Sequence, residues 1–283
     1  MTEICELFQQ IAVDIWDLIA RDNQREIPVI DERGITGIKI IDIIDEYVTA
    51  TGTTKVFAQK AIKEPKRGGD LEIYVEYTDK EYLRYFLQAK ALKEDGTYHD
   101  VNHRVNGRGP YQWDLLLNYS RTAKAIPRYI FYNGITNYKY SGVDCHGDFD
   151  EKQYGCAIAE VVPVRDYCLN NNTGRHPFLI NNTPPPVGSP WRFIPCCGVN
   201  SEITKQLDNG SLRLYSRSEI NMDKAFKKVF RFPRISGPPP DVEEEVEVEH
   251  VNNELSQEGW NPAGRVIVSK YGIKHGGELR MLG

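Results

Sequence analysis

Long apolar runs are missing from the sequence, and this absence argues against one large class of proteins. No stretch approaches the roughly 20 consecutive apolar residues that a membrane-spanning helix requires. The segment from Met1 to Leu18 is acidic and amphipathic, whereas a signal peptide combines a basic start with an apolar run. We therefore expect no membrane association, no signal peptide and a cytoplasmic location. Internal repeats are also missing.

An excess of positive charge is missing too. The 283 residues carry a formal net charge of −5, which argues against a protein that coats nucleic acid through general basicity. A local basic groove stays compatible with this charge, because affinity for phosphate depends on the local field. With 40% hydrophobic and 11% aromatic residues, the chain can bury a sizeable core without disulfide bonds.

The six cysteines follow no regular spacing. No Cys-x-x-Cys pair is followed by a matching second pair, so the usual pattern of a structural zinc site is missing. We predict single buried thiols in a reducing compartment. The alternative is a zinc site built from dispersed ligands, whose candidates are Cys145, His146, Cys156, Cys168, His176, Cys196 and Cys197.

The most informative stretch runs from Gly68 to Leu92. Apolar residues alternate with polar or aromatic ones from Leu71 to Val75, as in a half-buried strand. A polar turn follows at Thr78 to Lys80, and the alternation resumes from Tyr82 to Ala91. This pattern predicts a β-hairpin.

The hairpin is expected to bring four polar side chains together. Its second strand has two faces, with Phe86, Gln88 and Lys90 on one and Leu87, Ala89 and Ala91 on the other. We expect Asp70 and Glu72 of the first strand to lie beside Gln88 and Lys90.

These residue types suit the hydrolysis of phosphodiesters. That reaction needs a divalent metal held by oxygen ligands, and it benefits from a lysine that orients water and meets developing negative charge. Asp70 and an oxygen near Gln88 are the predicted ligands, and Lys90 is the predicted lysine. The alternative is a surface hairpin whose charges are solvated.

Periodicity predicts the other elements of the first half. Helices are expected over Thr2 to Asp22, after a capping Thr36, and over Tyr111 to Ala123. Strands are expected over Lys55 to Ile62 and Ile126 to Tyr132. Together these elements indicate an α/β or α+β fold, a mixed sheet flanked by helices.

The second half gives weaker signals. Gly155 to Val164 indicates a strand that ends in a proline, and Glu219 to Phe230 a short helix. Phe232 to Pro240 is typical of a linker, and Asp241 to His250 of an edge strand or a solvated acidic run. We therefore predict a core at residues 1–140 and an irregular, loop-rich C-terminal extension at 141–283. This extension packs on or extends the core, and its role is unknown.

The order of strand, Asp70, hairpin and Gln88-Ala89-Lys90 resembles the PD-(D/E)XK nuclease superfamily, in the Gln-x-Lys form of Mrr-type restriction endonucleases and related anti-phage effectors. More narrowly, the first half resembles an uncharacterised bacterial family built on a domain of unknown function. The blocks that carry this resemblance are Glu32-Arg-Gly-Ile-Thr36, Glu64, Gly68-Gly-Asp-Leu-Glu72, Gln88-Ala-Lys90, Gln112-Trp-Asp-Leu-Leu116 and Pro127-Arg-Tyr-Ile-Phe-Tyr-Asn133. Two departures, Leu71 for the usual Trp and Gly69 for the usual Ala, remove no catalytic group.

The superfamily resemblance implies a restriction-endonuclease-like core that requires a divalent metal. It implies that Asp70 binds the metal, that Lys90 is catalytic, and that Gln88 replaces the usual second acid. An amide is a weaker ligand for a hard cation than a carboxylate is. The missing charge is expected from one of three acids, Glu72, Glu64 or Glu32. Glu32 lies just before a predicted helix, and a helix-borne acid is a common extra ligand in this superfamily.

Further residues are candidates for holding the substrate. Gln112 is expected to contact the nucleic-acid backbone, with helix capping or packing as the alternative. Arg104 and Arg108 are expected to bind phosphate. A longer basic and aromatic path would add Lys66, Arg67, Arg121, Tyr98, Tyr111 and Trp113, although a solvated face explains the same residues.

The predicted function is a Mg²⁺- or Mn²⁺-dependent nuclease that cleaves DNA, with RNA as the alternative substrate, in bacterial defence against phage or mobile DNA. Nucleic acid is the expected partner, together with a second copy of the chain or a defence-system protein. One alternative is an inactive nucleic-acid- or protein-binding module with a nuclease-like fold. Another is a toxin or partner-binding component whose second half is the active surface. The acidic composition favours these alternatives, and the presence of both Asp70 and Lys90 favours the nuclease.

Overall fold

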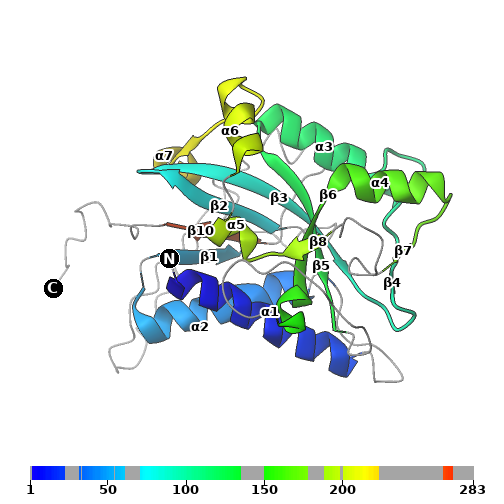
Figure 1. Cartoon of the computed structure of the whole chain (residues 1–283), viewed down its shortest axis with the longest axis horizontal. Coiled ribbons are helices and arrows are strands. Elements are labelled where there is room, and N and C mark those ends of the chain that lie inside the picture. The colour runs from blue at the N-terminus through cyan, green and yellow to red at the C-terminus, as the bar shows by residue number, and fades with distance from the viewer. Residues whose placement is uncertain are drawn as a thin grey trace, which may run out of the picture.

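A mixed β-sheet lies at the centre of the protein, with helices on both of its faces (Figure 1). The computed structural model describes residues 2–22, 32, 34–53, 55–60, 71–134, 150–177, 188–197, 200–222 and 264–269. The helices are α1 (Thr2–Asp22), η1 (Gly34–Ile40, a π-helix), α2 (Ile41–Thr51), η2 (Val105–Gly107), α3 (Gln112–Ala123), η3 (Glu151–Gly155), α4 (Val161–Asn170), α5 (Phe193–Cys197), α6 (Ser201–Asp208) and α7 (Arg217–Met222). The strands are β1 (Val56–Lys60), β2 (Leu71–Thr78), β3 (Glu81–Ala91), β4 (Thr97–Tyr98), β5 (Ile126–Tyr132), β6 (Cys156–Glu160), β7 (His176–Pro177), β8 (Gly188–Pro190), β9 (Tyr215–Ser216) and β10 (Gly264–Val268). The predicted α/β fold is confirmed.

The main sheet has the strand order β1-β10-β2-β3-β5-β6-β8, and β9 pairs with β3. The pairs β10–β2 and β3–β5 are parallel, whereas β2 and β3 form the predicted antiparallel hairpin. Strands β4 and β7 form a separate two-stranded sheet. The predicted hairpin therefore lies inside the sheet and not at its edge.

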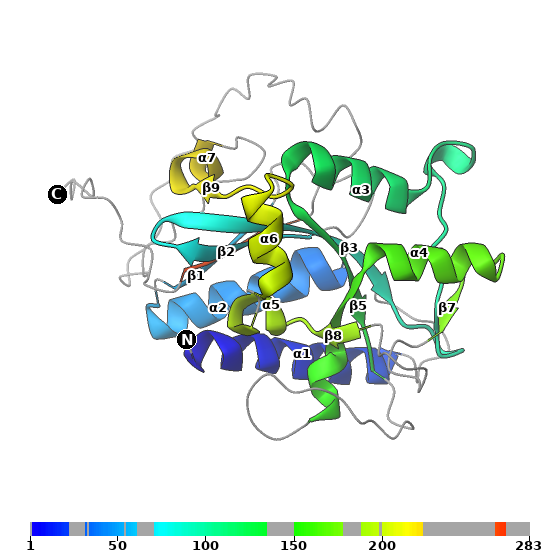
Figure 2. The same cartoon turned by 45° about the horizontal axis from the view of Figure 1, so that its top comes forward.

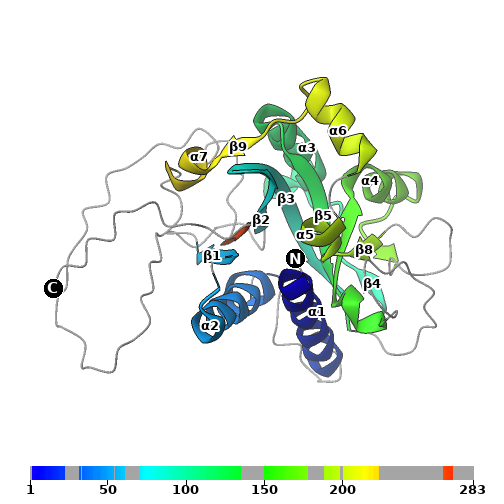
Figure 3. The ribbon, with the colours of Figure 1, turned by 60° about the vertical axis from the view of Figure 1, so that its left-hand side comes forward.

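Strands from both halves of the chain belong to this one sheet. The described part of 141–283 contributes β6, β8, β9 and β10, and it is more regular than the predicted extension. Strand β10 lies between β1 and β2, as Figure 3 shows. The predicted boundary near residue 140 stays a prediction, but it does not separate two sheets.

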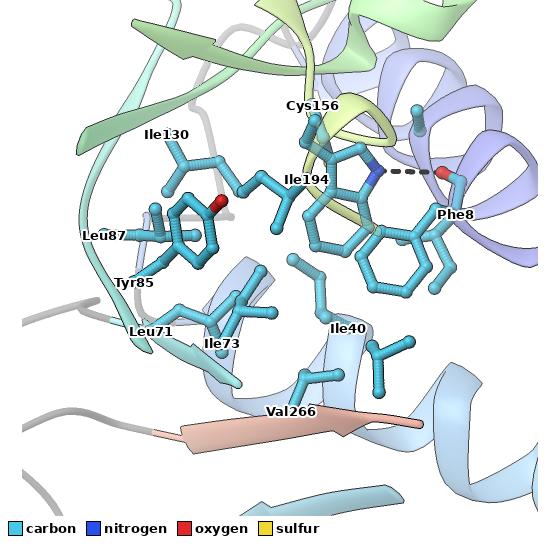
Figure 4. Packing of buried hydrophobic residues seen from close by; sticks show 14 of the residues in the cluster. Phe8, Ile40, Leu71, Ile73, Tyr85, Leu87, Ile130, Cys156, Ile194 and Val266 are labelled. Carbon is cyan, nitrogen blue, oxygen red and sulfur yellow. Dashed lines mark hydrogen bonds between the residues drawn. The ribbon is translucent and has the colours of Figure 1, made fainter. Parts of the chain in front are cut away.

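One face of the sheet packs against α1 and α2 (Figure 1). Helix α1 turns a stripe of Ile and Leu side chains toward the sheet, as the helical spacing predicts. The sheet contributes residues such as Leu71, Leu87 and Val266, which meet Phe8 and Ile40 in one cluster (Figure 4). The dashed line in Figure 4 marks the bond from Trp191 Nε1 to Phe8 O, at 2.8 Å.

The opposite face packs against α3 and α4, which lie on the same side of the sheet in Figure 2. Its core contains Phe86, Tyr129 and Phe131 from the strands, together with Trp113 and Leu116 from α3. A sheet covered on both faces buries its central strands completely, which explains why β3 has almost no exposed residue.

Glycine permits a close approach of α1 to η3. A Cβ atom on Gly155 would lie 1.8 Å from Ala12 O, a distance that no side chain can occupy. The main chain of η3 therefore packs directly on the helix backbone, and any larger residue would push α1 away.

Two element boundaries differ from the predictions. Thr36 does not cap a helix: it lies inside η1, and its hydroxyl bonds the Tyr132 hydroxyl at 2.6 Å. Strand β6 ends at Glu160, before the predicted end at Val164, because α4 starts at Val161. Pro163 lies in the first turn of α4, where a missing N–H costs no intrahelical bond. The linker at 232–240 and the acidic run at 241–250 lie outside the described residues.

The prediction of single thiols is wrong for part of the chain. Cys5 of α1 and Cys196 of α5 form a disulfide bond, and Cys197 is disulfide-bonded as well. Cys156 and Cys168 are free and buried, as predicted. Spacing gave no sign of the Cys5–Cys196 pair, because its members are 191 residues apart.

In the described ranges, no helix is both long and apolar enough to cross a membrane.

Candidate functional site

Strand β3 carries the predicted lysine and lies between β2 and β5. The side chains that it buries beneath α1 and α2 are Leu83, Tyr85, Leu87, Ala89 and Ala91. Phe86 packs on the opposite side, in the core beneath α3. Gln88 and Lys90 follow Phe86 at strand spacing, so they project to the α3 side. The predicted division of this strand into two faces is confirmed.

Lys90 is almost buried, with 8% of its surface exposed. Its Nζ donates hydrogen bonds to Asp100 O at 2.9 Å and to Gln112 Oε1 at 3.4 Å. Both acceptors are uncharged oxygens, and these bonds fix the direction of the ammonium.

Gln112 is the first residue of α3, directly beyond the polar loop at 99–111. Its main-chain N–H donates to His103 O at 3.0 Å, which fixes the start of the helix. Its side chain accepts from Lys90 and does not cap the helix. The predicted substrate residue therefore lies next to the predicted lysine, in contact with it.

Glu32 reaches the same end of β3 from the segment before η1. Its Oε1 accepts a hydrogen bond from Ala91 N at 3.2 Å. The next amide, Leu92 N, donates to Tyr132 O on the β5 side. Since amides alternate along a strand, Ala91 N points to the β2 side, beyond Leu71, the first described residue of β2. An acid thus lies beside the residue that follows Lys90.

Glu72 lies elsewhere, and its surroundings disfavour the predicted catalytic and metal-binding roles. Arg84 Nη2 donates to its Oε1 at 2.6 Å, and Arg265 Nε and Nη2 donate to its Oε2 at 3.3 and 3.2 Å. The carboxylate is only 1% exposed. Both oxygens are engaged by guanidinium groups, so we take Glu72 out of the candidate site.

Glu72, Arg84 and Arg265 form a buried ion cluster in the sheet. Burial lowers the pKa of the Arg84 guanidinium, but the charge of Glu72, the neighbouring Tyr74 and Tyr215 and the hydrogen bond to Glu72 together raise it above its usual value. Burial and the Glu72 charge also raise the pKa of Tyr74. Arg84 lies against the rings of Phe86, at 4.4 Å, and Tyr215, at 5.4 Å. These contacts fit a structural ion cluster.

Arg104 and Arg108 lie on the loop that precedes α3, and both are exposed. Arg104 lies over the ring of Tyr111, with 3.9 Å from Cζ to the ring centroid. The structure therefore places both predicted phosphate contacts on the loop that ends at Gln112. Lys66 and Arg67 lie outside the described residues.

Asp70 and Glu64 also lie outside the described residues, so their predicted metal binding stays a prediction. Asp70 immediately precedes β2 in the sequence. Within the described ranges, no group of three or more His, Cys, Asp or Glu side chains is arranged to hold a metal. The oxygen donors that are described, the Glu32 carboxylate and the Gln88 amide, are of the type that Mg²⁺ or Mn²⁺ prefers.

The dispersed zinc site is not supported by its described candidates. Cys196 is in a disulfide bond and cannot bind metal as a thiolate. Burial raises the pKa of Cys168 to about 11 and that of Cys156 as well, so both remain thiols at neutral pH. Cys145 and His146 lie outside the described residues.

Sequence patterns missed two parts of this site. Asp100 contributes its main-chain oxygen, and any residue type carries that atom. The structure shows a left-handed backbone at Asp100, with φ of 53°, a conformation that Asp tolerates better than most residues, so the residue type was the one available signal. The hairpin pairing of Arg104 with Tyr111 was also missed, since it depends on a single bridge.

Comparison with known proteins identifies one family. The model of a family described as "Family of unknown function (DUF6615)" matches residues 4–270, a range that includes every candidate site residue. No curated protein and no solved structure matches the chain.

Proposed function

Because the chain belongs to this family of unknown function, we propose a function from its site: a divalent-metal-dependent nuclease that hydrolyses DNA phosphodiesters, with RNA as the alternative substrate. The proposal includes a PD-(D/E)XK-like core, to which the Gln88-Ala89-Lys90 pattern and the mixed sheet both correspond.

One observation carries the proposal. Three segments that are far apart in the sequence meet at the end of β3, where Glu32 bonds the amide of Ala91 while Lys90 bonds Gln112. A carboxylate, an ammonium and an amide are the groups that a phosphodiester hydrolase uses to bind metal, position water and hold a phosphate.

Each residue has a proposed role. Glu32, Gln88 and Asp70 hold Mg²⁺ or Mn²⁺, which when bound activates water and neutralises phosphate charge. Lys90 orients the attacking water and stabilises the negative charge that develops on the phosphate oxygens. Gln112 and Asp100 O hold the Lys90 ammonium in position. Arg104 and Arg108 bind the substrate.

A second candidate function is an inactive nucleic-acid- or protein-binding module. The surroundings of Glu72 favour it: this carboxylate pairs with Arg84 and Arg265, so the candidate site has one carboxylate fewer to bind a metal. Gln88 in place of an acid weakens metal binding further.

The test is cleavage of plasmid DNA and of single-stranded RNA by the purified protein in Mg²⁺, Mn²⁺ or EDTA. We expect cleavage in either metal, none in EDTA, and at least about a hundredfold loss in Lys90→Ala. Lys152→Ala is the matched control, since Lys152 makes an exposed ion pair with Asp17. Cleavage that survives Lys90→Ala or chelation contradicts the proposal, and folded protein that cleaves neither substrate favours the binding module.

The proposed setting is bacterial defence against phage or mobile DNA in the cytoplasm, acting alone, as a homo-oligomer or with a defence-system protein. Cells that express the protein should then resist phage infection, and cells that express Lys90→Ala should not. Equal plaque numbers in both strains would argue against this setting and leave the biochemical activity standing.

A further inference from the structure

The loop before α3 presents a planar cation on a stack of aromatic rings. The Arg104 guanidinium lies 3.9 Å from the Tyr111 centroid, and the Tyr111 and Trp113 rings stack with 4.5 Å between centroids and 26° between planes. Trp113 is buried, at 1% exposed, while Arg104 is exposed. Three flat groups thus follow one another from the core to the surface, and the outermost one is a guanidinium.

The backbone fixes this stack. Arg104 and Tyr111 face each other in an antiparallel bridge, so their side chains emerge on the same side. Hydrogen bonds from Val105 N to Pro110 O, at 3.1 Å, and from Gln112 N to His103 O, at 3.0 Å, flank that bridge. The guanidinium is therefore held in place before any ligand arrives, which lowers the entropy cost of binding.

The charge of Arg104 is not neutralised by any carboxylate in the part of the chain that the structure describes. Its one side-chain hydrogen bond there is from Nη1 to Gly109 O, at 3.4 Å. Arg213 offers a direct comparison, because it lies 4.0 Å from the Tyr215 ring but forms an ion pair with Glu219 at 2.9 Å. Arg213 thus makes a similar ring contact, but its charge is already paired with a carboxylate.

The stack adjoins the candidate site. Tyr111 directly precedes Gln112, whose side chain contacts Lys90. A chain that crosses the Lys90 end of β3 therefore meets Arg104 close by, and the exposed Arg108 extends the positive charge along the same loop.

We propose that this stack binds one unpaired nucleobase of a single-stranded nucleic acid against the Arg104 guanidinium. Bases inside a duplex have both faces covered by their neighbours, whereas an unstacked base offers a free face to an arginine or an aromatic ring. The substrate of the proposed nuclease is then single-stranded or locally unpaired. This last step rests on the proposed function, but the binding itself does not.

The first test measures the affinity of the wild-type protein in EDTA, by fluorescence anisotropy, so that metal-dependent cleavage does not interfere. The probes are a labelled single-stranded DNA, the same sequence as RNA, the matching DNA duplex, and an abasic single strand with the same number of phosphates. We expect at least one of the two base-bearing single strands to bind about fivefold or more tighter than the abasic strand and the duplex. Equal affinity for base-bearing and abasic strands would overturn the proposal, and the preferred single strand distinguishes DNA from RNA.

Variants then identify the residue. Arg104→Ala and Arg104→Lys should both lose the preference for bases over the abasic strand, although Lys keeps the charge and much of the salt dependence. Arg213→Ala, which removes an equivalent ring contact, should bind like the wild type. An Arg104→Lys variant with full base preference would show that charge alone suffices and would refute stacking. Thermal melting of the three variants confirms that each is folded.

The two proposals fail separately. Base-dependent binding without cleavage in any metal refutes the nuclease and keeps the inference. Cleavage of duplex DNA that is unaffected by Arg104→Ala, with no base preference in EDTA, refutes the inference and keeps the nuclease.

Discussion

The Glu32 carboxylate bonds a main-chain amide through one of its two oxygens, at a position 59 residues before its partner Ala91. A main-chain donor does not neutralise the negative charge as a guanidinium does. Glu32 therefore keeps its negative charge, which a metal ligand needs. It lies at the same end of β3 as Lys90, whose positive charge suits a site that binds phosphate.

Glu32→Gln tests this role, because a glutamine oxygen can accept the same bond from Ala91 N while the charge is lost. We expect the affinity for Mn²⁺, measured by calorimetric titration, to fall by at least about tenfold. The free energy of unfolding should change by no more than about 0.5 kcal/mol. Unchanged Mn²⁺ affinity would remove Glu32 from the site.

Glu72→Gln should act on stability instead. The change leaves the Arg84 and Arg265 guanidinium groups buried without their shared carboxylate, and we expect a loss of about 3–5 kcal/mol in urea unfolding. Glu160→Gln is the matched control: Glu160 pairs with Arg128 at the surface, so its loss should cost about 0–1 kcal/mol. If Glu72→Gln left stability intact and abolished Mn²⁺ binding, Glu72 would be a metal ligand after all.

At the scale of the elements, hydrogen bonds and ion pairs around Asp95 connect the two strands of the short β4–β7 sheet. Asp95 Oδ2 lies 2.8 Å from His99 Nε2 and 2.9 Å from Arg175 Nη1, and Thr97 donates to Oδ1. This network joins the loop that carries Asp100 to the loop before β7. The strand pair thus supports the main-chain oxygen that bonds Lys90.

A pH dependence follows from this network. Burial alone would raise the pKa of Asp95, but hydrogen bonds from Thr97 and His99 lower it to about 2, below its usual value of 3.8. A lowered pKa in the folded state means that the stabilisation is present above about pH 4 and is lost as the pH falls toward 2.

The stability difference between wild type and Asp95→Asn should therefore shrink as the pH falls from about 5, roughly one unit above the usual pKa, to about 2, the pKa in the folded state. Its full size should be at most about 1 kcal/mol, because the carboxylate is 38% exposed and screened by solvent. Urea unfolding at several pH values measures it. A difference that stays constant over this range would show that the carboxylate charge contributes nothing.

Elements with a local signal could be predicted from the sequence. Helix α1 follows from its apolar spacing and β3 from its alternation, and both match the predicted ranges within a residue. Strand β10 could not be predicted, because it has only five residues and pairs with β2, about 190 positions earlier, and with β1, more than about 200 positions earlier. The same reason hid the partners of Glu72: Arg265 is 193 residues away, and no spacing rule connects the two.

For the candidate site, the sequence identified Lys90, Gln112 and Glu32, which the structure brings to one end of β3. The partners of Glu72 could not be predicted, because alternation places Glu72 on the face of Phe86 and cannot reveal what that face meets. Side-chain partners contributed by distant segments decide between a catalytic acid and a structural one.

For the whole molecule, two connections join the beginning and the end of the chain. Strand β10 completes the sheet between β1 and β2, and the Cys5–Cys196 bond ties α1 to α5. Disulfide bonds are rare in the cytosol. The predicted cytoplasmic location therefore stays a prediction, without the support that single thiols would have given it.

The disulfide should contribute strongly to stability, because it closes a loop between residues 191 positions apart. We expect Cys5→Ala to lower the free energy of unfolding under oxidising conditions by up to about 5 kcal/mol. Cys168→Ala, which removes a buried free thiol, is the control and should cost about 1 kcal/mol. Equal losses in both variants, or a wild type unaffected by reductant, would contradict this role.

The measurement that tests the central claim most directly is the rate of DNA cleavage as a function of Mg²⁺ concentration, for the wild type and Lys90→Ala. The site at the end of β3 predicts that the variant loses at least about a hundredfold in maximal rate at saturating Mg²⁺, because a positioned charge is lost at the reacting phosphate. A variant that reaches the wild-type maximal rate would show that the cleavage does not depend on the site at the end of β3.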